Sequence, residues 1–551
     1  MKASLWANFL GVNLPSNILD KEAEFPTSCQ AFQPDTKTDN TFLEFTEYIP
    51  AGTNLSLPFN DASCARPSQF ISVDLCRIAL LLETSNRSVV STEVWLPRNW
   101  SGRFLGTGNG GIDGCIKYED LEYGAVNGFA VVGSNNGHNG TAGDSFYQNA
   151  EVLRDFAWRA HVTPSPYMAG KEATRLFYGR PHTKSYFSGC SFGGRQGVFS
   201  AERFPADFDG IIAGAPAVDF NNLVSWRAGF FPTTGSTGSI GFIEPYIWKG
   251  LIHAEVLKQC DMLDGVGDGI IEDPTLCNFS PEAVMCTKER VNNCLNPDQA
   301  EVVRKVFSPM YGEDGRTVFP AMQPGSELEA AENLYTGKPF SYSKVCNPNR
   351  SKYKTLLTPS KDWFKYVVYD PSWNPANFDI HDAKVADSLN PENIKTWPNS
   401  LSQYAQRGGK MIVFHGQQDG KITSFNTERF YNHLSQGMGT SPSELDDFFR
   451  FFRIPGMSHC GSGPGAWAFG QGGKFEVARA PFRPSENILA ALVAWVELGL
   501  APDTVRGTKY VNDSLELGVA FRRDHCRYPL RSSYTRGDQW RCVSSEPLKK
   551  Q

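Results

Sequence analysis

The sequence predicts an α/β fold, with a mostly parallel β-sheet covered by helices on both faces and interrupted by a large insertion. Short apolar stretches alternate with amphipathic helical stretches in 104–213 and again in 410–499, as in parallel strands joined by crossover helices. Between about 220 and 395 this alternation is lost, and proline-containing turns, cysteines and aromatic residues take its place. We therefore expect one core domain built from 26–219 and 396–551, with an inserted lid domain at 220–395.

The strands of the core are expected where short apolar stretches are bounded by glycine or polar residues. A pair of prolines, Pro164 and Pro166, divides the longest helical stretch, because proline is excluded from helix interiors. The first region is expected to contain strands at 104–105, 128–133, 185–188 and 210–213, two helices within 150–178 and a helix at 194–204. The second region is expected to contribute strands at 410–414 and 449–454 and a helix near 485–499.

The composition is that of a folded protein exported to an oxidising compartment. The chain has 551 residues, of which 40% are hydrophobic and 20% charged, which suits one large domain with an insertion or two domains. The net charge of −6 argues against a nucleic-acid partner, and no apolar run is long enough for a membrane span. Thirteen cysteines spread along the chain favour disulfides and secretion, with one cysteine left over.

Glycosylation sequons support the secretory route of a eukaryote. Each match could arise by chance because the pattern is short, but the matches and the cysteines point the same way. Residues 1–25 do not form a clean signal peptide, since the apolar stretch is interrupted and no clear cleavage site follows, so no element is predicted there. The sequons lie at Asn54, Asn86, Asn99, Asn139, Asn278, Asn349 and Asn512.

A nucleophile is predicted at Ser191. The segment Gly189-Cys-Ser-Phe-Gly193 has the Gly-X-Ser-X-Gly pattern and lies between an expected strand and an expected helix, which is the setting of a nucleophile elbow. Glycines allow the sharp turn that exposes the hydroxyl, and the following helix N-terminus favours a developing negative charge. The pattern alone also fits a structural turn; its flanking strand and helix favour the nucleophile.

An acid and a base follow the nucleophile in chain order. Asp419 and His459 each occupy the loop after one of the two strands expected in the second region. An α/β-hydrolase orders its triad as serine, acid and histidine. His459 would take the proton from Ser191 and return it to a leaving alcohol, while Asp419 fixes the tautomer. His415 and His138 are alternative bases, each interpreted as a structural or pocket histidine. The pattern predicts a serine esterase.

Two cysteines offer an independent test of this triad. Cys190 directly precedes Ser191, and Cys460 directly follows His459. If the serine and the histidine lie within hydrogen-bonding reach, their neighbours fall within disulfide range. In the chain-entropy model a bridge closing a loop of about 270 residues contributes at most roughly 5–6 kcal/mol. The alternative is two unrelated cysteines.

An oxyanion hole needs two backbone donors aimed at the same point. One donor should be the N–H of the residue after the nucleophile, Phe192. The second is expected from the glycine-rich run 108–111, with Gly110 or Gly111 as the donor. The alternative for this run is a flexible turn.

The expected insertion contains an acidic, glycine-rich loop. Its carboxylates are Asp261, Asp264 and Asp268, and Cys260 and Cys277 bracket it. Hard oxygen ligands on a tightly bent loop suit Ca²⁺, although the spacing is not that of an EF-hand. Asp-Gly turns are common, so the residues alone leave a structural calcium site and a plain turn equally open.

A set of motifs runs along the chain from Cys29 to Cys542. They are Gly108–Gly111, Gly189–Ser191 with Gly193–Gly197, Asp261–Asp273, Arg407–Lys410, Gly456–Gly461 and His525–Pro529. In these motifs the sequence resembles the tannase/feruloyl esterase family, in particular its fungal type B feruloyl esterases. The paired Cys-Ser and His-Cys motifs, whose cysteines bridge in that family, are highly specific.

The resemblance implies a calcium site and further disulfides. The implied Ca²⁺ ligands are Asp261, Asp264 and Asp268 with the carbonyl groups of Val266 and Ile270. The implied bridges are Cys29–Cys76, Cys64–Cys115, Cys260–Cys277, Cys286–Cys294 and Cys526–Cys542, which leaves Cys346 as the odd thiol. The chain departs from the family at Asp419-Gly-Lys-Ile, where Asp-Pro is frequent, and at Phe192, which replaces a smaller or polar residue and could reshape the pocket.

The resemblance implies a secreted serine carboxylic ester hydrolase. It would release hydroxycinnamic acids (ferulic, p-coumaric, caffeic) from plant cell-wall esters through an acyl-enzyme on Ser191. Its partners would be small phenolic esters and feruloylated wall polysaccharide. Within the family the alternative is a tannase acting on galloyl esters. From another class, the alternative is a catalytically silent wall-binding protein on the esterase scaffold, against which the intact triad argues.

Overall fold

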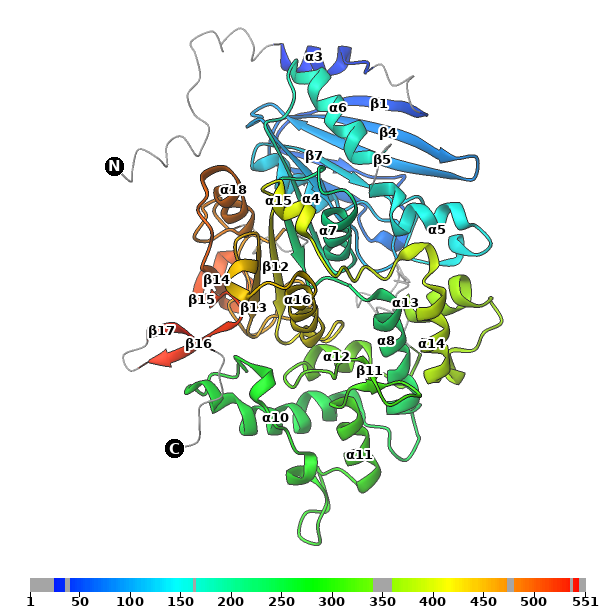
Figure 1. Ribbon diagram of the computed structural model, residues 1–551, viewed down its shortest axis with the longest axis vertical. Helices are drawn as coiled ribbons and strands as arrows, with labels where there is room; N and C mark the ends of the chain where they lie inside the picture. Colours follow the sequence, from blue (N-terminus) through cyan, green and yellow to red (C-terminus); the bar gives the residue numbers. More distant parts are fainter. Residues whose placement is uncertain are drawn as a thin grey trace.

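A nine-stranded mixed sheet forms the centre of the molecule (Figure 1). The computed structural model describes residues 24–34, 40–161, 165–339, 359–472, 480–535 and 539–544. The strand order is β1-β4-β5-β7-β6-β8-β9-β12-β13. The strands are β1 (Thr41–Ile49), β4 (Leu75–Ser85), β5 (Ser88–Pro97), β6 (Arg103–Thr107), β7 (Phe129–Ser134), β8 (Lys184–Cys190), β9 (Gly210–Gly214), β12 (Lys410–Gly416) and β13 (Phe449–Ile454).

The two halves of this sheet pair differently. Strands β1, β4, β5 and β7 are antiparallel neighbours, whereas every pairing from β7 through β6, β8, β9 and β12 to β13 is parallel. The parallel half contains all the strands expected from the sequence. The arrangement is that of an α/β-hydrolase and confirms the expected fold class.

Helices cover both faces of the sheet because successive strand residues point to opposite faces. Along β12, Ile412 and Phe414 pack with the helices α4 and α18, and Met411 and Val413 pack with α6, α7 and α16 on the other face. Pro166 begins α6 instead of breaking a helix, and Ser165 caps that end. The helices are α3 (Phe25–Ala31), α4 (Tyr118–Val126), α5 (Ala150–Ala157), α6 (Pro166–Tyr178), α7 (Phe192–Arg203), α15 (Ser402–Gln406), α16 (Ser424–Met438), α17 (Pro442–Leu445) and α18 (Ile488–Leu498).

The chain between β9 and β12 forms a mainly helical body beside the sheet, drawn in green and yellow-green in Figure 1. It has its own apolar cluster, which includes Trp226, Trp248 and Val303 and continues into Phe156 and Phe192 of the core segments. The insertion is therefore packed against the start of α7. Its elements include α8 (Phe220–Thr234), α9 (Pro245–Ile247), α10 (His253–Cys260), α11 (Pro297–Val306), β10 (Met310–Tyr311), β11 (Thr317–Phe319), α12 (Glu327–Asn333), α13 (Pro359–Trp363) and α14 (Ile380–Leu389).

Three small hairpins complete the described chain, and disulfides fasten all three of them. The hairpins are β2 (Thr53–Ser56) with β3 (Ser68–Ile71), β14 (Thr504–Tyr510) with β15 (Val519–Cys526), and β16 (Leu530–Thr535) with β17 (Gln539–Ser544). The bridges are Cys29–Cys76, Cys64–Cys115, Cys190–Cys460, Cys260–Cys277, Cys286–Cys294 and Cys526–Cys542. These are the expected pairs; Cys346 lies outside the described residues. Among the described helices, none combines the length and apolar character that crossing a membrane requires.

Candidate active site

Ser191 lies at the sharp junction between β8 and α7. Its backbone angles are φ 65° and ψ −122°, a conformation that is strained for any residue with a side chain. Backbone hydrogen bonds hold it, from the Ser191 amide to the Gly214 carbonyl at 2.8 Å and to the Ser191 carbonyl from the amides of Ala217 and Arg195 at 3.0 and 3.1 Å. A Cβ on Gly189 would lie 2.7 Å from the backbone of Gly193. Only glycine therefore allows strand and helix to approach this closely.

Asp419 and His459 are hydrogen-bonded to each other. His459 Nδ1 lies 2.6 Å from Asp419 Oδ2, while Oδ1 accepts from the amides of Lys421 and Ile422 at 2.8 and 2.9 Å. Burial alone would raise the pKa of Asp419, but the charge of His459 and hydrogen bonds from His415 and His459 hold it well below its usual range. The carboxylate is therefore ionised and fixed in orientation.

The Cys190–Cys460 disulfide joins the two halves of the site. Its Cα atoms are 6.1 Å apart across a sequence separation of 270 residues. Ser191 and His459, the neighbours of these cysteines, line one cavity of about 760 Å³. The structure thus brings together the serine, the histidine and the carboxylate singled out in the sequence.

Glu329, on α12 of the insertion, ties the two loops of the second region together. Its Oε2 accepts from the amide of Gly420 at 2.9 Å and from the amide of His459 at 3.0 Å. Its Oε1 lies 3.2 Å from Lys421 Nζ. Sequence reasoning missed this residue, because its partners are more than ninety positions away and only folding brings them near. The insertion therefore supports the site and lines part of its cavity.

His415 does not face the cavity. Its side chain is fully buried, with Nε2 lying 3.0 Å from Asp419 Oδ2 and 3.1 Å from the Ile422 carbonyl, and Nδ1 lying 2.7 Å from Thr427 Oγ1. Both neighbours of Nε2 are acceptors, so we assign the proton to Nε2 and the Nδ1 hydrogen bond to the Thr427 hydroxyl as donor. His415 therefore donates to the same carboxylate oxygen as His459.

His138 is a structural residue of the core. Its Nε2 lies 2.9 Å from the carbonyl of Ile112, and its ring packs against Phe146 at a centroid distance of 4.9 Å. Burial lowers the pKa of His138. It does not line the cavity that contains Ser191, so the geometry favours His459 as the base over both other histidines.

The glycine-rich loop after β6 lies directly against the turn at Ser191. The Gly193 amide donates to the Asn109 carbonyl at 2.9 Å, and Gln196 Oε1 accepts from the Asn109 amide at 3.0 Å. A Cβ on Gly108 would lie 2.6 Å from the Gly193 Cα. Close approach of the two backbones therefore requires glycine at both positions.

The amides expected to form the oxyanion hole differ in how they are engaged. Neither the Phe192 amide, at the first turn of α7, nor the Gly111 amide bonds to another described residue. The Gly110 amide makes a long contact of 3.4 Å with Asp113 Oδ1. Gly110 and Gly111 both line the cavity. The free Phe192 and Gly111 donors are the better pair for a developing negative charge.

The side chain of Phe192 lies in the core and not in the pocket. It stacks on Phe156 at a centroid distance of 4.3 Å and contacts Phe220 edge-on at 5.5 Å. It is only 1% exposed and is absent from the cavity wall. The expectation that this residue could reshape the pocket is therefore wrong, because the side chain at the start of α7 points into the apolar cluster shared with the insertion.

The acidic loop is held by its own backbone. Asp261 accepts from the amides of Gly269 and Ile270, and Asp264 Oδ1 accepts from the Val266 amide. Within the described ranges no three acidic, histidine or cysteine side chains form a ready metal cage. However, Asp264 Oδ2 is buried without a hydrogen-bonding partner among them. A buried carboxylate oxygen in this state fits a cation.

The charge balance of this loop is incomplete. Burial, together with the charges of Asp268 and Asp261, raises the pKa of Asp264 to about 6. One guanidinium compensates in part, since Arg523 Nη2 lies 2.6 Å from Asp268 Oδ2. The donor set therefore fits Ca²⁺ at Asp264 and Asp261, while Arg523 shares Asp268.

Comparison with known proteins agrees with this geometry. The family profile described as "Tannase and feruloyl esterase" matches residues 76–548. The "Probable feruloyl esterase B-2" of Aspergillus flavus is 69% identical over 537 residues, covering 97% of this chain and 99% of that protein. The crystal structure of feruloyl esterase B from Aspergillus oryzae superimposes with a TM-score of 0.86 at 42% identity, covering 94% and 100% of the two chains.

A solved structure of lower sequence identity shares the fold. The tannin acyl hydrolase from Aspergillus niger has a TM-score of 0.72 at 22% identity, with 94% of each chain covered. The feruloyl esterase B structure is much nearer in sequence, whereas the tannin acyl hydrolase shows the shared fold alone. The chain belongs to the tannase and feruloyl esterase family.

Proposed function

We propose that this protein is a feruloyl esterase that releases hydroxycinnamic acids from plant cell-wall esters. The single observation that supports this most directly is the constellation of Ser191, His459 and Asp419, with the first two lining one cavity and their neighbours joined by a disulfide. The 69% identity to a probable feruloyl esterase B-2 supports the choice of substrate within the family.

The proposed reaction proceeds through an acyl-enzyme. Ser191 Oγ attacks the ester carbonyl while His459 Nε2 takes its proton, and Asp419 stabilises the resulting imidazolium. The amides of Phe192 and Gly111 would hold the oxyanion. The C–O bond of the ester then breaks as His459 returns the proton to the leaving alcohol. Water, deprotonated by His459, attacks the acyl-enzyme, and Ser191 is regenerated as the free acid departs.

The experiment that tests this proposal compares initial rates on methyl ferulate, methyl caffeate, methyl p-coumarate and methyl gallate. The Ser191→Ala variant serves as the blank for uncatalysed hydrolysis. We expect faster turnover of the cinnamates. Preference for the gallate would make the protein a tannase with the same machinery, and absence of turnover on every ester would favour the silent wall-binding alternative.

The disulfide next to the triad is expected to be needed for activity. Without the Cys190–Cys460 bridge, the loop carrying His459 can drift, and a shift of about 1 Å costs on the order of 100-fold in rate. A Cys190→Ser/Cys460→Ser variant should show this loss in kcat on methyl ferulate. The matched control is Cys286→Ser/Cys294→Ser, which removes a bridge of the insertion spanning only 8 residues; equal activity of the two variants would contradict the role.

His415 is expected to act as a positioning residue for Asp419. The His415→Leu variant removes the N–H that donates to Asp419 Oδ2, and we expect kcat to fall roughly 10- to 100-fold with little change in KM. The carboxylate left with one donor fewer attracts the His459 imidazolium more strongly. The acid limb of the pH profile of kcat/KM should therefore move to higher pH.

Two further variants separate this role from a general loss of stability. His415→Gln retains an N–H group and should recover part of the rate. Thr427→Val removes the hydroxyl that donates to His415 Nδ1, and should shift the pH profile in the same direction by a smaller amount. A lower Tm with an unshifted pH profile in all three variants would show that His415 only packs the core.

The proposal includes a structural Ca²⁺ bound by Asp261, Asp264 and Asp268 with the carbonyl groups of Val266 and Ile270. It is supported by the unpartnered oxygen of Asp264 and by the resemblance of the loop to the family motif. When bound, the ion would neutralise the carboxylates and stabilise the insertion without taking part in ester hydrolysis.

Removal of calcium is therefore expected to lower the Tm by about 3 °C or more, because a ligand that binds only the folded state stabilises it. The measurement is thermal unfolding with and without a chelator, followed by Ca²⁺ addition. Asp264→Asn should abolish the chelator effect, whereas Asp314→Asn, at an exposed position of the same insertion, should retain it. An unchanged Tm after chelation of the wild type would count against the site.

Export as a glycoprotein is part of the same proposal. All of the sequon asparagines within the described residues are exposed, as attachment of a glycan requires. Six disulfides favour an oxidising compartment. The exposed asparagines are Asn54, Asn86, Asn99, Asn139, Asn278 and Asn512, while Asn349 lies outside the described residues. Mass spectrometry before and after enzymatic deglycosylation tests this.

A further inference from the structure

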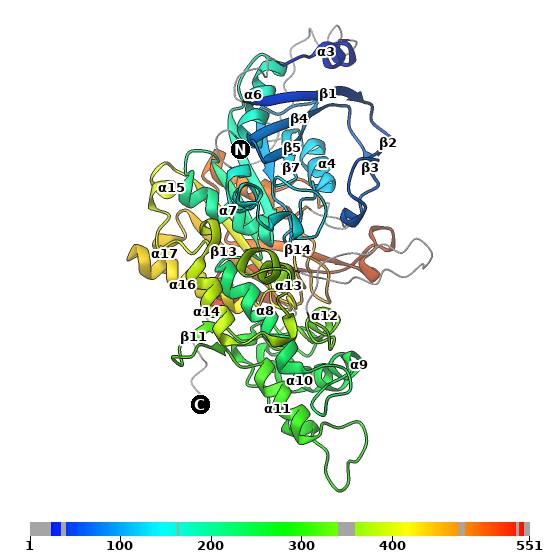
Figure 2. The ribbon, with the colours of Figure 1, turned by 90° about the vertical axis from the view of Figure 1, so that its right-hand side faces the viewer.

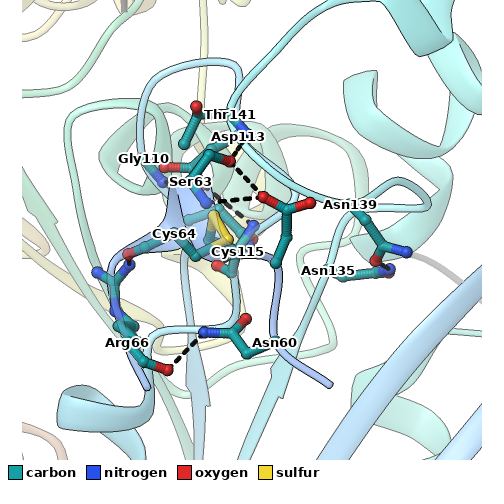
Figure 3. The surroundings of a disulfide bond; sticks show 12 residues. Asn60, Ser63, Cys64, Arg66, Gly110, Asp113, Cys115, Asn135, Asn139 and Thr141 are labelled. Carbon is teal, nitrogen blue, oxygen red and sulfur yellow. Dashed lines mark hydrogen bonds between the residues drawn. A yellow bond between two sulfur atoms is a disulfide. The ribbon is translucent and has the colours of Figure 1, made fainter. Parts of the chain in front are cut away.

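A second cavity of about 820 Å³ lies next to the catalytic one. The two share Cys64 in their walls, which the bridge to Cys115 fixes in place. Figure 3 shows this bridge with Gly110 and Asp113 of the catalytic cavity on one side and Asn60 of the second cavity on the other. A ligand in the second cavity would therefore lie close to the catalytic cavity.

The second cavity is bounded by one face of the sheet and by the hairpin β2–β3. Its walls are the segment 53–61 on the hairpin side and residues of β1, β4 and β5 on the sheet side. Figure 2 shows β2 and β3 standing opposite these strands. The hairpin and the sheet do not pack directly against each other, as two apolar faces would.

The sheet side of the cavity carries buried charged groups as well as apolar residues. Arg77 Nε donates to Glu93 Oε2 at 2.7 Å, and Arg77 Nη1 donates to Glu47 Oε2 at 3.3 Å. The Tyr118 hydroxyl donates to Glu93 Oε1 at 3.1 Å. Arg77 and Glu93 are 9% and 5% exposed. Burying such a pair is costly, and apolar residues would pack the hairpin at least as well. Packing of the hairpin against the sheet therefore does not explain why this charged pair lies there.

Aromatic rings stand at the open edge of the cavity. The Phe59 side chain is 98% exposed, although it belongs to the cavity wall. Phe45 is 37% exposed, and the Arg77 guanidinium lies 4.8 Å from the centre of its ring. A solvent-facing aromatic ring beside fixed polar groups is typical of a surface that binds an amphipathic ligand.

The charges of the wall select against anionic ligands. Four carboxylates, Glu44, Glu47, Asp61 and Glu93, accompany the single guanidinium of Arg77, which is already paired, so an anion would be repelled. The described part of the chain gathers no metal-binding cluster there. Carboxylates and amides accept hydrogen bonds from hydroxyl groups, and aromatic rings pack against C–H faces.

We propose that this second cavity binds a neutral chain of pyranose sugars. Two sources carry that chemistry. If the protein is the feruloyl esterase proposed above, the polysaccharide that bears the ester supplies such a chain. The protein's own N-glycans are the other source, because the sequon residues Asn54 and Asn139 both line the cavity. Either source places a sugar chain beside the catalytic cavity.

Calorimetric titration with xylohexaose tests the proposal and separates the two sources. The full-length Asn54→Gln/Asn139→Gln protein, which cannot carry the two glycans, should bind xylohexaose. Adding Phe59→Ala should weaken this binding about tenfold, as expected for loss of an aromatic ring that packs on a sugar. The matched control is Phe70→Ala, which removes a ring 52% exposed that does not line the cavity. Its affinity should be unchanged.

The remaining outcomes are distinguishable. If only the glycan-free protein binds xylohexaose, and deglycosylation of the native protein lowers its Tm, the protein's own glycans occupy the cavity. Absence of binding by the glycan-free protein, together with an unchanged Tm on deglycosylation, would overturn the proposal. Hydrolysis of methyl ferulate by the Phe59→Ala variant should equal that of the wild type, so a failure of the proposed esterase activity is detected separately from a failure of sugar binding.

Discussion

The Ser191→Ala variant is expected to lose about 10⁶-fold in kcat on methyl ferulate while remaining folded. The reason is that no other hydroxyl in the elbow has the required position. Ser191 alone occupies the strained junction between β8 and α7, and the residue as a whole is only 8% exposed. Alanine can retain the same backbone because the hydrogen bonds that hold the turn, to Gly214 and from Ala217, involve only main-chain atoms.

Three measurements check this expectation together. Steady-state rates report the loss, a Tm near that of the wild type reports an intact fold, and mass spectrometry of the wild type during turnover should detect a serine-linked acyl group that the variant lacks. Ser185→Ala, in β8 and outside the cavity wall, is the matched control. A Ser191→Ala protein with wild-type rates would remove Ser191 from the mechanism and with it the whole triad.

Asp419→Asn should lower kcat about 10⁴-fold, because an amide cannot replace both carboxylate oxygens here. Oδ1 accepts from two backbone amides, and Oδ2 faces the ring nitrogens of His459 and His415. If the amide oxygen takes the place of Oδ1, its NH₂ group faces both imidazoles and favours the wrong tautomer of His459. If it takes the place of Oδ2, the NH₂ group opposes two N–H donors.

The measurement is kcat for Asp419→Asn against pH, beside Asp447→Asn as a control outside the site. The wrong tautomer leaves His459 with its proton on Nε2, so the hydroxyl of Ser191 has no acceptor. We expect the variant to bind methyl ferulate with nearly unchanged KM. A loss confined to KM would instead indicate that Asp419 only shapes the cavity.

The sequence predicts the parallel half of the sheet better than the antiparallel half. Strands such as β9 and β12 are almost fully buried because helices cover both faces of the sheet. Strands β4 and β5 carry Arg77 and Glu93 on the face of the second cavity, so their pattern is interrupted and no strand was expected there. The strands of the sheet that the sequence does not predict are therefore those that face a partly open cavity.

The site shows the same division between local and long-range signals. Ser191, Asp419 and His459 each follow a strand, so their place in the chain reveals them. Glu329 and His415 carry no such signal. Glu329 reaches His459 over 130 positions, and the role of His415 depends on which of its two nitrogens faces Asp419, which no sequence pattern specifies.

The contacts of Glu329 have a consequence for exchanging parts between members of this family. One carboxylate from the insertion accepts hydrogen bonds from the amides of both Gly420 and His459. The insertion is therefore bonded directly to the two catalytic loops of the hydrolase core. A chimaera that takes its insertion from a relative to alter substrate choice would also replace the residue that makes these two hydrogen bonds. Such a chimaera should keep its kcat only where the donor supplies a carboxylate at the position of Glu329. Substrate specificity and catalytic rate therefore cannot be exchanged independently of each other.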